Sequence, residues 1–183
     1  EKTQARKELD IPEDVFVLMS FGGSRGAEKI NEVMLDALPD FAEKRNLFTV
    51  FVTGRYYIES VKKEICERDI TLGKNVRLLE YIDNMDKYIA ACDLVVSRAG
   101  ALTVSEITVC GRASVLVPSP NVTGNHQYYN AKAVADKDFT AEVLKENVYK
   151  LMNDRKMLAE LEHESKNAAP GDAAEIIYNE VFK

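Results

Sequence analysis

The chain reads DVFVLMSF over residues 14–21 and continues without a break as GGSRGA over residues 22–27. The first segment is a near-continuous apolar run of strand length, which is typical of a strand buried on both faces of a parallel sheet. Apolar residues from Ile30 to Leu38 then recur at helical spacing, and Pro39 is expected to stop that helix. A strand that passes through a glycine-rich turn into a helix is the opening of a βαβ unit.

The same alternation continues along the chain. Further strands are expected at 47–53, 75–79, 93–97 and 114–118. Helical segments are expected between them at 57–65, 85–91 and 100–110, and two or three more helices complete the chain, one of them capped by Thr140. This order predicts one Rossmann-like α/β domain over residues 1–183, with a doubly wound parallel sheet that binds ligands beyond the carboxyl ends of its strands.

Composition narrows the class of protein. The 183 residues include 30 acidic and 24 basic side chains, for a formal net charge of −6, and 46% are hydrophobic. This mixture fits a folded domain with a core and disfavours both disorder and nucleic-acid binding. No apolar run approaches the roughly 18 residues of a membrane helix.

The three cysteines form no metal or disulfide pattern. Cys66, Cys92 and Cys110 are widely spaced and include no C-x-x-C pair, which favours a reducing, cytoplasmic compartment. The chain begins at Glu1 without an initiator Met, and we therefore interpret it as a fragment of a longer protein.

Residues 22–26 (GGSRG) suit an anion. Glycines let backbone N–H groups approach a phosphate, the following helix N-terminus adds a partial positive charge, and Ser24 adds a hydroxyl donor. The segment is neither a G-x-G-x-x-G fingerprint nor a Walker loop. A tight strand-to-helix turn would need the same glycines, so both interpretations stay open.

Residues 97–106 (SRAGALTVSE) also join a strand to a helix, at the same edge of the predicted sheet. Thr103 can exchange hydrogen bonds with a ligand, and Glu106 can accept them from two ribose hydroxyls. Ordinary helix capping, with Glu106 complementing the helix dipole, explains the spacing at least as well.

The loop at 118–127 carries Asn125, His126 and Gln127, whose amide and imidazole groups suit sugar hydroxyls. Asp136 and Asp138 have D-x-D spacing but lack further oxygen ligands, so no metal site is predicted. The chain contains no nucleophile elbow, no zinc-protease motif and no evident general base. We therefore predict no catalytic residue and no cofactor.

Four motifs in order resemble the MurG transferase family, which adds N-acetylglucosamine to lipid-linked muramyl-pentapeptide in bacterial peptidoglycan synthesis. They are residues 22–27 (GGSRGA), 81–85 (YIDNM), 97–106 (SRAGALTVSE) and 118–130 (PSPNVTGNHQYYN). The similarity runs from about residue 5 to the C-terminus. It implies the C-terminal, donor-binding half of a GT-B glycosyltransferase, in which two Rossmann-like domains flank a cleft.

The resemblance also implies roles for single residues in binding UDP-N-acetylglucosamine. The glycine-rich loop with Ser24 would face the diphosphate, the Ile82 backbone would meet the uracil, and Glu106 would hold the ribose hydroxyls. His126 and Gln127 would contact the sugar, although the family often has Gln where His126 stands. The full set of implied binding residues is Gly23, Ser24, Arg25, Gly26, Ile82, Met85, Ala101, Leu102, Thr103, Glu106, His126 and Gln127.

The acceptor side would belong to an N-terminal domain of the same protein. That domain would supply the candidate base and would bind the lipid-linked muramyl-pentapeptide, so the isolated chain is expected to bind donor and transfer little sugar. The full protein would lie peripherally on the cytoplasmic face of the bacterial inner membrane. Residues 172–183 would form the closing helix, and the short strand that the family has after Asp136 is in doubt here.

Three other functions remain open on the sequence alone. The chain could be a stand-alone sugar-nucleotide-binding subunit that pairs with a separate acceptor-binding chain. It could be a non-catalytic nucleotide- or phosphoprotein-binding module. A sugar-nucleotide epimerase is a further alternative, but it should carry its own acid–base groups.

Overall fold

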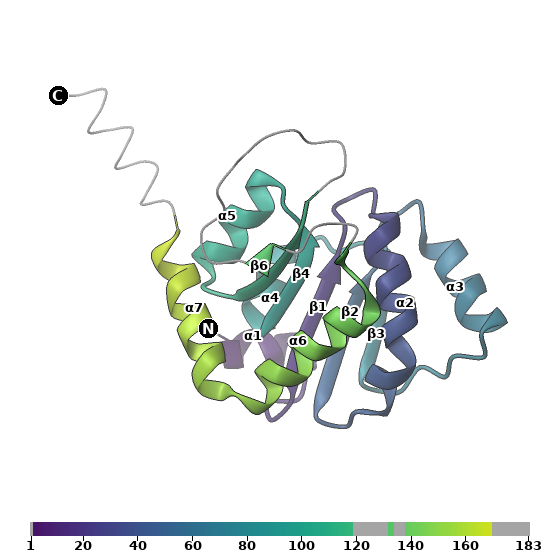
Figure 1. Ribbon diagram of the computed structural model, residues 1–183, viewed down its shortest axis with the longest axis horizontal. Helices are drawn as coiled ribbons and strands as arrows, with labels where there is room; N and C mark the ends of the chain where they lie inside the picture. Colours follow the sequence, from purple (N-terminus) through teal and green to yellow (C-terminus); the bar gives the residue numbers. More distant parts are fainter. Residues whose placement is uncertain (1, 119–131, 134–137, 170–183) are drawn as a thin grey trace.

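The computed structural model describes residues 2–118, 132–133 and 138–169 (Figure 1). Its centre is a parallel sheet of six strands in the order β3-β2-β1-β4-β5-β6. The strands are β1 (Phe16–Phe21), β2 (Leu47–Val52), β3 (Val76–Leu79), β4 (Leu94–Arg98), β5 (Ala113–Val117) and β6 (Lys132–Ala133).

Helices cover both faces of the sheet, as expected for a doubly wound fold. They are α1 (Lys2–Glu8), α2 (Glu28–Glu43), α3 (Ile58–Glu67), α4 (Met85–Ala91), α5 (Ala101–Val109), α6 (Ala141–Asn153) and α7 (Arg155–Asn167). One apolar cluster joins the sheet to α2, α3 and α6, and a second joins its other face to α1, α4 and α5. In Figure 1, α2 and α6 lie in front of the strands.

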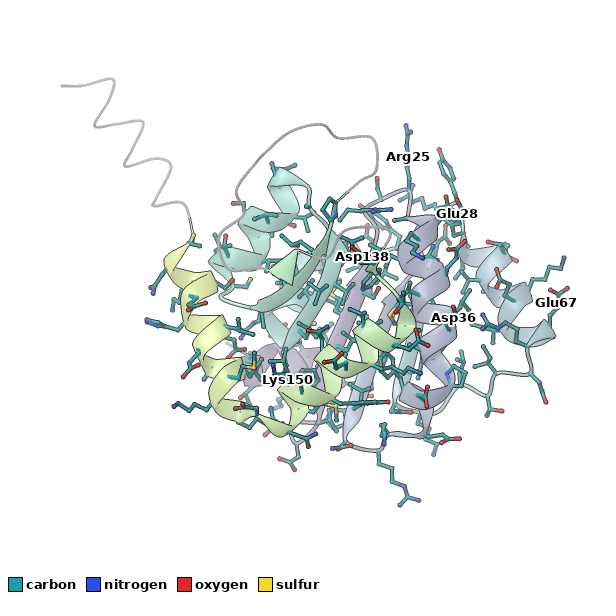
Figure 2. The ribbon with its side chains drawn as sticks, viewed as in Figure 1. Arg25, Glu28, Asp36, Glu67, Asp138 and Lys150 are labelled. Carbon is teal, nitrogen blue, oxygen red and sulfur yellow. The ribbon has the colours of Figure 1, made fainter. Side chains whose placement is uncertain are left out.

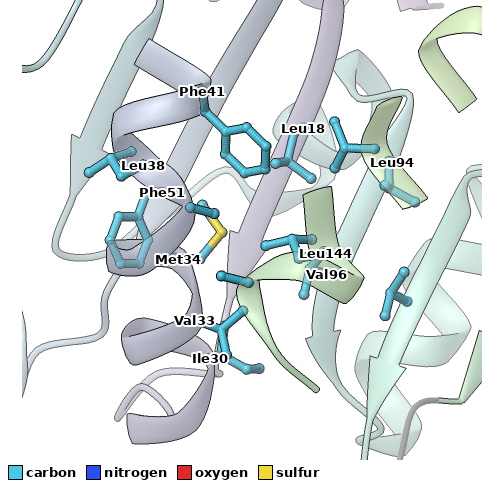
Figure 3. Packing of buried hydrophobic residues seen from close by; sticks show 14 of the residues in the cluster. Leu18, Ile30, Val33, Met34, Leu38, Phe41, Phe51, Leu94, Val96 and Leu144 are labelled. Atoms are coloured by element: carbon cyan, nitrogen blue, oxygen red, sulfur yellow. The ribbon is translucent and has the colours of Figure 1, made fainter. Parts of the chain in front are cut away.

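Strand β1 shows why the sequence folds this way. All six of its residues are buried. Phe16 and Leu18 pack into the α2 side of the core, and the alternate residues Val17, Met19 and Phe21 pack into the other side. Figure 3 shows Leu18 among residues of α2, including Met34 and Phe41. The near-continuous apolar run is therefore explained by burial on two faces.

The prediction that Pro39 ends its helix is wrong, because α2 continues through Pro39 to Glu43. Proline in a helix interior costs about 3 kcal/mol. Pro39 itself is exposed, whereas Phe41 beyond it is fully buried and meets the Tyr149 ring edge-on at 6.2 Å. Burial of a large apolar side chain contributes about 1.5–3 kcal/mol, which offsets most of the proline penalty.

Helix α1 was not predicted, and buried charges anchor it. The Arg6 guanidinium donates to Asp93 Oδ2 at 2.7 Å and to the Ala91 carbonyl at 3.0 Å. Lys2 Nζ lies 2.8 Å from both Asp93 Oδ1 and Glu162 Oε1. Asp93 Oδ2 also accepts from the Val17 N–H at 2.7 Å. This network, which we call the anchor cluster, joins α1, the start of β1, the start of β4 and α7.

The sequence left in doubt whether a short strand follows Asp136, and the structure places its sixth strand just before that residue. The sheet does have a sixth strand, but it is β6 at 132–133, which pairs in parallel with Val115 and Leu116 of β5. Residues 134–137 and the expected closing helix at 172–183 lie outside the described part of the chain. Within the ranges that the structure describes, no helix is long and apolar enough to cross a membrane.

Candidate functional site

The strand order reverses direction beside β1. The chain steps outward from β1 to β2 and β3, and then returns to place β4 on the opposite side of β1. In open parallel sheets, ligands bind at such a switch point, beyond the carboxyl ends of the strands. The loops that meet this edge near the switch point are residues 22–27 after β1, which we call the glycine loop, and residues 99–100 after β4.

The glycine loop is a tight turn in which two glycines, Gly23 and Gly26, have left-handed backbone conformations but different surroundings. Gly23 has φ +87° and Gly26 has φ +91°, and the Gly26 N–H donates to the Gly23 carbonyl at 3.0 Å. A Cβ on Gly26 would lie 2.2 Å from the Thr53 carbonyl oxygen, so that position needs glycine for packing. A Cβ on Gly23 would meet nothing within 4 Å, so Gly23 borders open space that a ligand can enter.

The loop after β2, residues 53–57, braces the glycine loop. A Cβ on Gly54 would lie 2.2 Å from the Gly26 nitrogen, so the two backbones are in direct contact. Asn31 of α2 donates through Nδ2 to the Thr53 carbonyl at 2.9 Å and ties the helix to the same loop. Sequence reasoning missed this support, although a glycine directly after a predicted strand was a usable signal.

The N-termini of α2 and α5 have backbone donors without a capping side chain. Their N-cap residues, Ala27 and Gly100, make no side-chain capping hydrogen bond, and the same holds for α3 and α4. In contrast, Thr140 caps α6 and Asp154 caps α7, which confirms the predicted role of Thr140. Of the helices at this edge, α2 and α5 follow the two strands that flank the switch point, so their first-turn N–H groups are placed to receive an anion.

Helix α5 presents an exposed first turn. Leu102 is 83% exposed, Ala101 is also exposed and Thr103 is half-buried. Glu106 is exposed one turn further on, and the first turn of α5 contains no acidic residue. The capping interpretation of Glu106 is therefore wrong, because Glu106 lies beyond the turn that a cap would serve.

The loop after β3 brings Ile82 and Met85 to the same side. The Ile82 side chain is buried in the apolar cluster of α4 and α5, with Met85, Ala99 and Val104 packed against that cluster. Among the described residues, the Ile82 N–H and C=O groups have no hydrogen-bond partner. The buried side chain thus fixes the position of the Ile82 backbone, whose N–H and C=O groups are not used by the described part of the chain.

Arginines at this edge have distinct surroundings. Arg25 is exposed and points away from the molecule (Figure 2). Arg98, at the end of β4, donates through Nη1 to the Pro118 carbonyl at 2.7 Å and so fixes the exit of β5. Sequence reasoning missed this role of Arg98, and a long cationic side chain at the end of a strand was the available signal.

His126 and Gln127 lie outside the described residues. In the described ranges, no group of three His, Cys, Asp or Glu side chains could hold a metal ion. Asp138 of the D-x-D pair is exposed, and its partner Asp136 is not described.

A doubly wound sheet with two uncapped helix N-termini at its switch point is the arrangement typical of nucleotide-binding α/β domains. More particularly, the chain belongs to the family described as glycosyltransferase family 28, C-terminal domain, whose pattern matches residues 17–177. This match confirms the predicted family and the Rossmann-like, GT-B type of fold.

Individual relatives agree with this family. A protein of Acetivibrio thermocellus named UDP-N-acetylglucosamine–N-acetylmuramyl-(pentapeptide) pyrophosphoryl-undecaprenol N-acetylglucosamine transferase is 37% identical over 98% of this chain and 50% of its own length. The crystal structure of Acinetobacter baumannii MurG superposes with a TM-score of 0.75 at 27% identity, over 92% of this chain and 52% of that one. The UDP-GlcNAc 2-epimerase of Neisseria meningitidis, bound to UDP-GlcNAc, has a TM-score of 0.70 at 15% identity over 99% of this chain and 48% of its own, and shares the fold alone. The chain spans about half the length of the curated relatives that it matches.

Proposed function

We propose that this chain is the donor-binding domain of an inverting transferase that moves N-acetylglucosamine from UDP-N-acetylglucosamine to lipid-linked muramyl-pentapeptide. Membership of glycosyltransferase family 28 and the names of the relatives at 36–37% identity support this function. The structural observation that supports it best is that α2 and α5, the helices that follow the two strands flanking the switch point, both have uncapped N-termini.

The chemistry of this arrangement suits a departing nucleoside diphosphate. Each helix N-terminus offers roughly half a positive charge, and its backbone N–H groups are already oriented. Such preorganised donors stabilise negative charge that develops on a leaving group. We therefore propose that the site works without a metal or another cofactor.

The other contacts of the donor are those that the family resemblance implies. The backbone of Ile82, with Met85 nearby, would meet the uracil, and Glu106 would accept from the ribose hydroxyls. Ala101, Leu102 and Thr103 would border the phosphates and the sugar. We propose that His126 and Gln127 contact the sugar hydroxyls.

The acceptor and the base that deprotonates it would come from the remainder of a longer protein. That remainder would form an N-terminal domain facing the donor edge, and it would place the enzyme peripherally on the cytoplasmic face of the membrane. On this proposal the 183-residue chain binds donor and gives little turnover by itself. Robust sugar transfer by the chain alone would contradict that division of labour.

Calorimetric titration tests the donor site directly. UDP-N-acetylglucosamine and UDP should bind, and ADP should bind much more weakly. Glu106→Gln should weaken the uridine compounds by about 1.5–3 kcal/mol, or about 10- to 150-fold, through the loss of charge-assisted hydrogen bonds. Glu146→Gln, at an exposed glutamate of α6, is the matched control and should change nothing.

Two results would count against the proposal. Equal affinity for ADP and UDP would favour a general nucleotide-binding module instead. If the chain binds none of the three compounds, the titration is repeated on the protein with its N-terminal half, and failure there as well would reject a UDP-sugar site.

A further inference from the structure

Arg55 lies in the loop after β2 and directly against the glycine loop. Its backbone N–H donates to the Ser24 carbonyl at 3.4 Å. The neighbouring Gly54 is in backbone contact with Gly26. The main chain of Arg55 is therefore fixed beside the segment that we assign to the diphosphate.

The Arg55 side chain is oriented without being neutralised. Its guanidinium carbon lies 4.5 Å from the centre of the Tyr81 ring, at cation–π distance. No Asp or Glu of the described residues forms an ion pair with Arg55, and its side chain makes no hydrogen bond within that part of the chain. Stacking on a ring face leaves the planar fork of N–H donors available to an anion.

The charge balance at this edge calls for one more cation. Each phosphate of a sugar nucleotide carries a negative charge, whereas each helix N-terminus supplies only about half a positive charge. Arg98 is held by the Pro118 carbonyl, and Arg25 points outward (Figure 2). The chain as a whole has a net charge of −6, so no general positive field makes up the difference.

We infer that Arg55 is a further donor-binding residue, which contacts the diphosphate from the side of β2 while Tyr81 holds its guanidinium in place. This inference rests on the proposed function. It assigns a third loop to the site, beside the loops after β1 and β4. It also explains the exposed Tyr81 ring, which would orient the Arg55 guanidinium at the rim of the site.

The test compares phosphate-dependent with phosphate-independent binding. UDP and uridine are titrated by NMR, which measures millimolar affinities, into the 183-residue chain and its variants. Arg55→Gln should weaken UDP by about 10- to 100-fold, as expected for loss of a charge-assisted contact, and should leave uridine unchanged. Arg55→Lys keeps the charge without the planar fork and should lose less than Arg55→Gln. Arg155→Gln is the matched control, because Arg155 is exposed and also lies over an aromatic ring, that of Phe16 at the first residue of β1, and it should alter UDP affinity by less than about twofold.

The outcomes distinguish a failure of the role assigned to Arg55 from a failure of the proposed donor-binding function. Unchanged UDP affinity in Arg55→Gln, with the wild-type chain binding UDP, overturns the role of Arg55 alone. A parallel loss of UDP and uridine shows that Arg55 only supports the loops, and also overturns it. A wild-type chain that binds neither compound, even with its N-terminal half, rejects the proposed function.

Discussion

Two glycine substitutions separate packing from ligand access in the glycine loop. Gly23 and Gly26 both have positive φ, so an alanine at either position costs about 1–2 kcal/mol of backbone strain. At Gly26 the new Cβ would also lie 2.2 Å from the Thr53 carbonyl oxygen and 2.7 Å from a Tyr57 ring carbon. Overpacking of this kind adds about 1–3 kcal/mol, because the backbone oxygen has to move. Gly26→Ala should therefore lose about 2–5 kcal/mol of stability and Gly23→Ala about 1–2 kcal/mol.

Urea denaturation at equilibrium measures both losses, and UDP titration measures the effect on the site. Gly23→Ala places its methyl group in the open space beside the proposed diphosphate, so it should weaken UDP while the fold stays nearly intact. Gly26→Ala should show the larger drop in the urea midpoint. If Gly26→Ala is as stable as Gly23→Ala, the close contact between the glycine loop and the β2 loop is not maintained in solution. If Gly23→Ala binds UDP normally, the open space beside Gly23 is not the ligand site.

Two further predictions concern buried groups. Arg6→Met should destabilise the fold by about 3–5 kcal/mol, because it removes one partner from the buried carboxylate of Asp93. Lys87→Met, in an exposed pair with Glu8, should leave the stability in urea almost unchanged, and a loss as large as that of Arg6→Met would contradict the anchoring role of Arg6. Burial, and secondarily the charge of Asp93, raises the pKa of the Cys92 thiol, so it stays protonated in the folded state while the unfolded thiol ionises above about pH 9. The stability that Cys92 contributes is therefore present at neutral pH and falls by about 1.4 kcal/mol per pH unit above pH 9. In Cys92→Ala, the free energy of unfolding should fall less steeply with pH in this range, by that slope. An unchanged pH dependence would show that the thiol is not buried.

The elements predicted most accurately from the sequence are those that can be recognised from their own residues, without knowing which distant residues pack against them. The five longer strands are mainly apolar because helices cover both faces of the sheet, so each is recognisable alone. Pro39 misled because the decisive contribution, burial of Phe41 against Tyr149, comes from a helix more than 100 residues away. Helix α1 was missed because seven residues show little periodicity, and because its anchors, Asp93 and Glu162, are remote in sequence.

The candidate site was predictable in part for the same reason. Loops that follow strands could be assigned to one edge of the sheet from their order alone. The bracing of the glycine loop by Gly54 and the stacking of Arg55 on Tyr81 depend on how neighbouring loops meet, which spacing does not encode. The capping interpretation of Glu106 was already at odds with the helix predicted at 100–110, because Glu106 lies beyond the first turn of a helix that starts there, as α5 does.

The anchor cluster has a consequence for how the chain folds. Lys2 and Glu162 are 160 positions apart in sequence, and Arg112 Nη1 reaches the same Glu162 oxygen at 3.2 Å. Contacts of such high sequence separation form late, because a long loop has to close before they can be made. During synthesis from the N-terminus, α1 would leave the ribosome long before α7 exists to neutralise Lys2 and cover Arg112. The Lys2–Glu162 contact therefore waits for α7, the last helix that the structure describes, and a pulse-labelling hydrogen-exchange experiment should find α1 at its full protection only in the last folding phase.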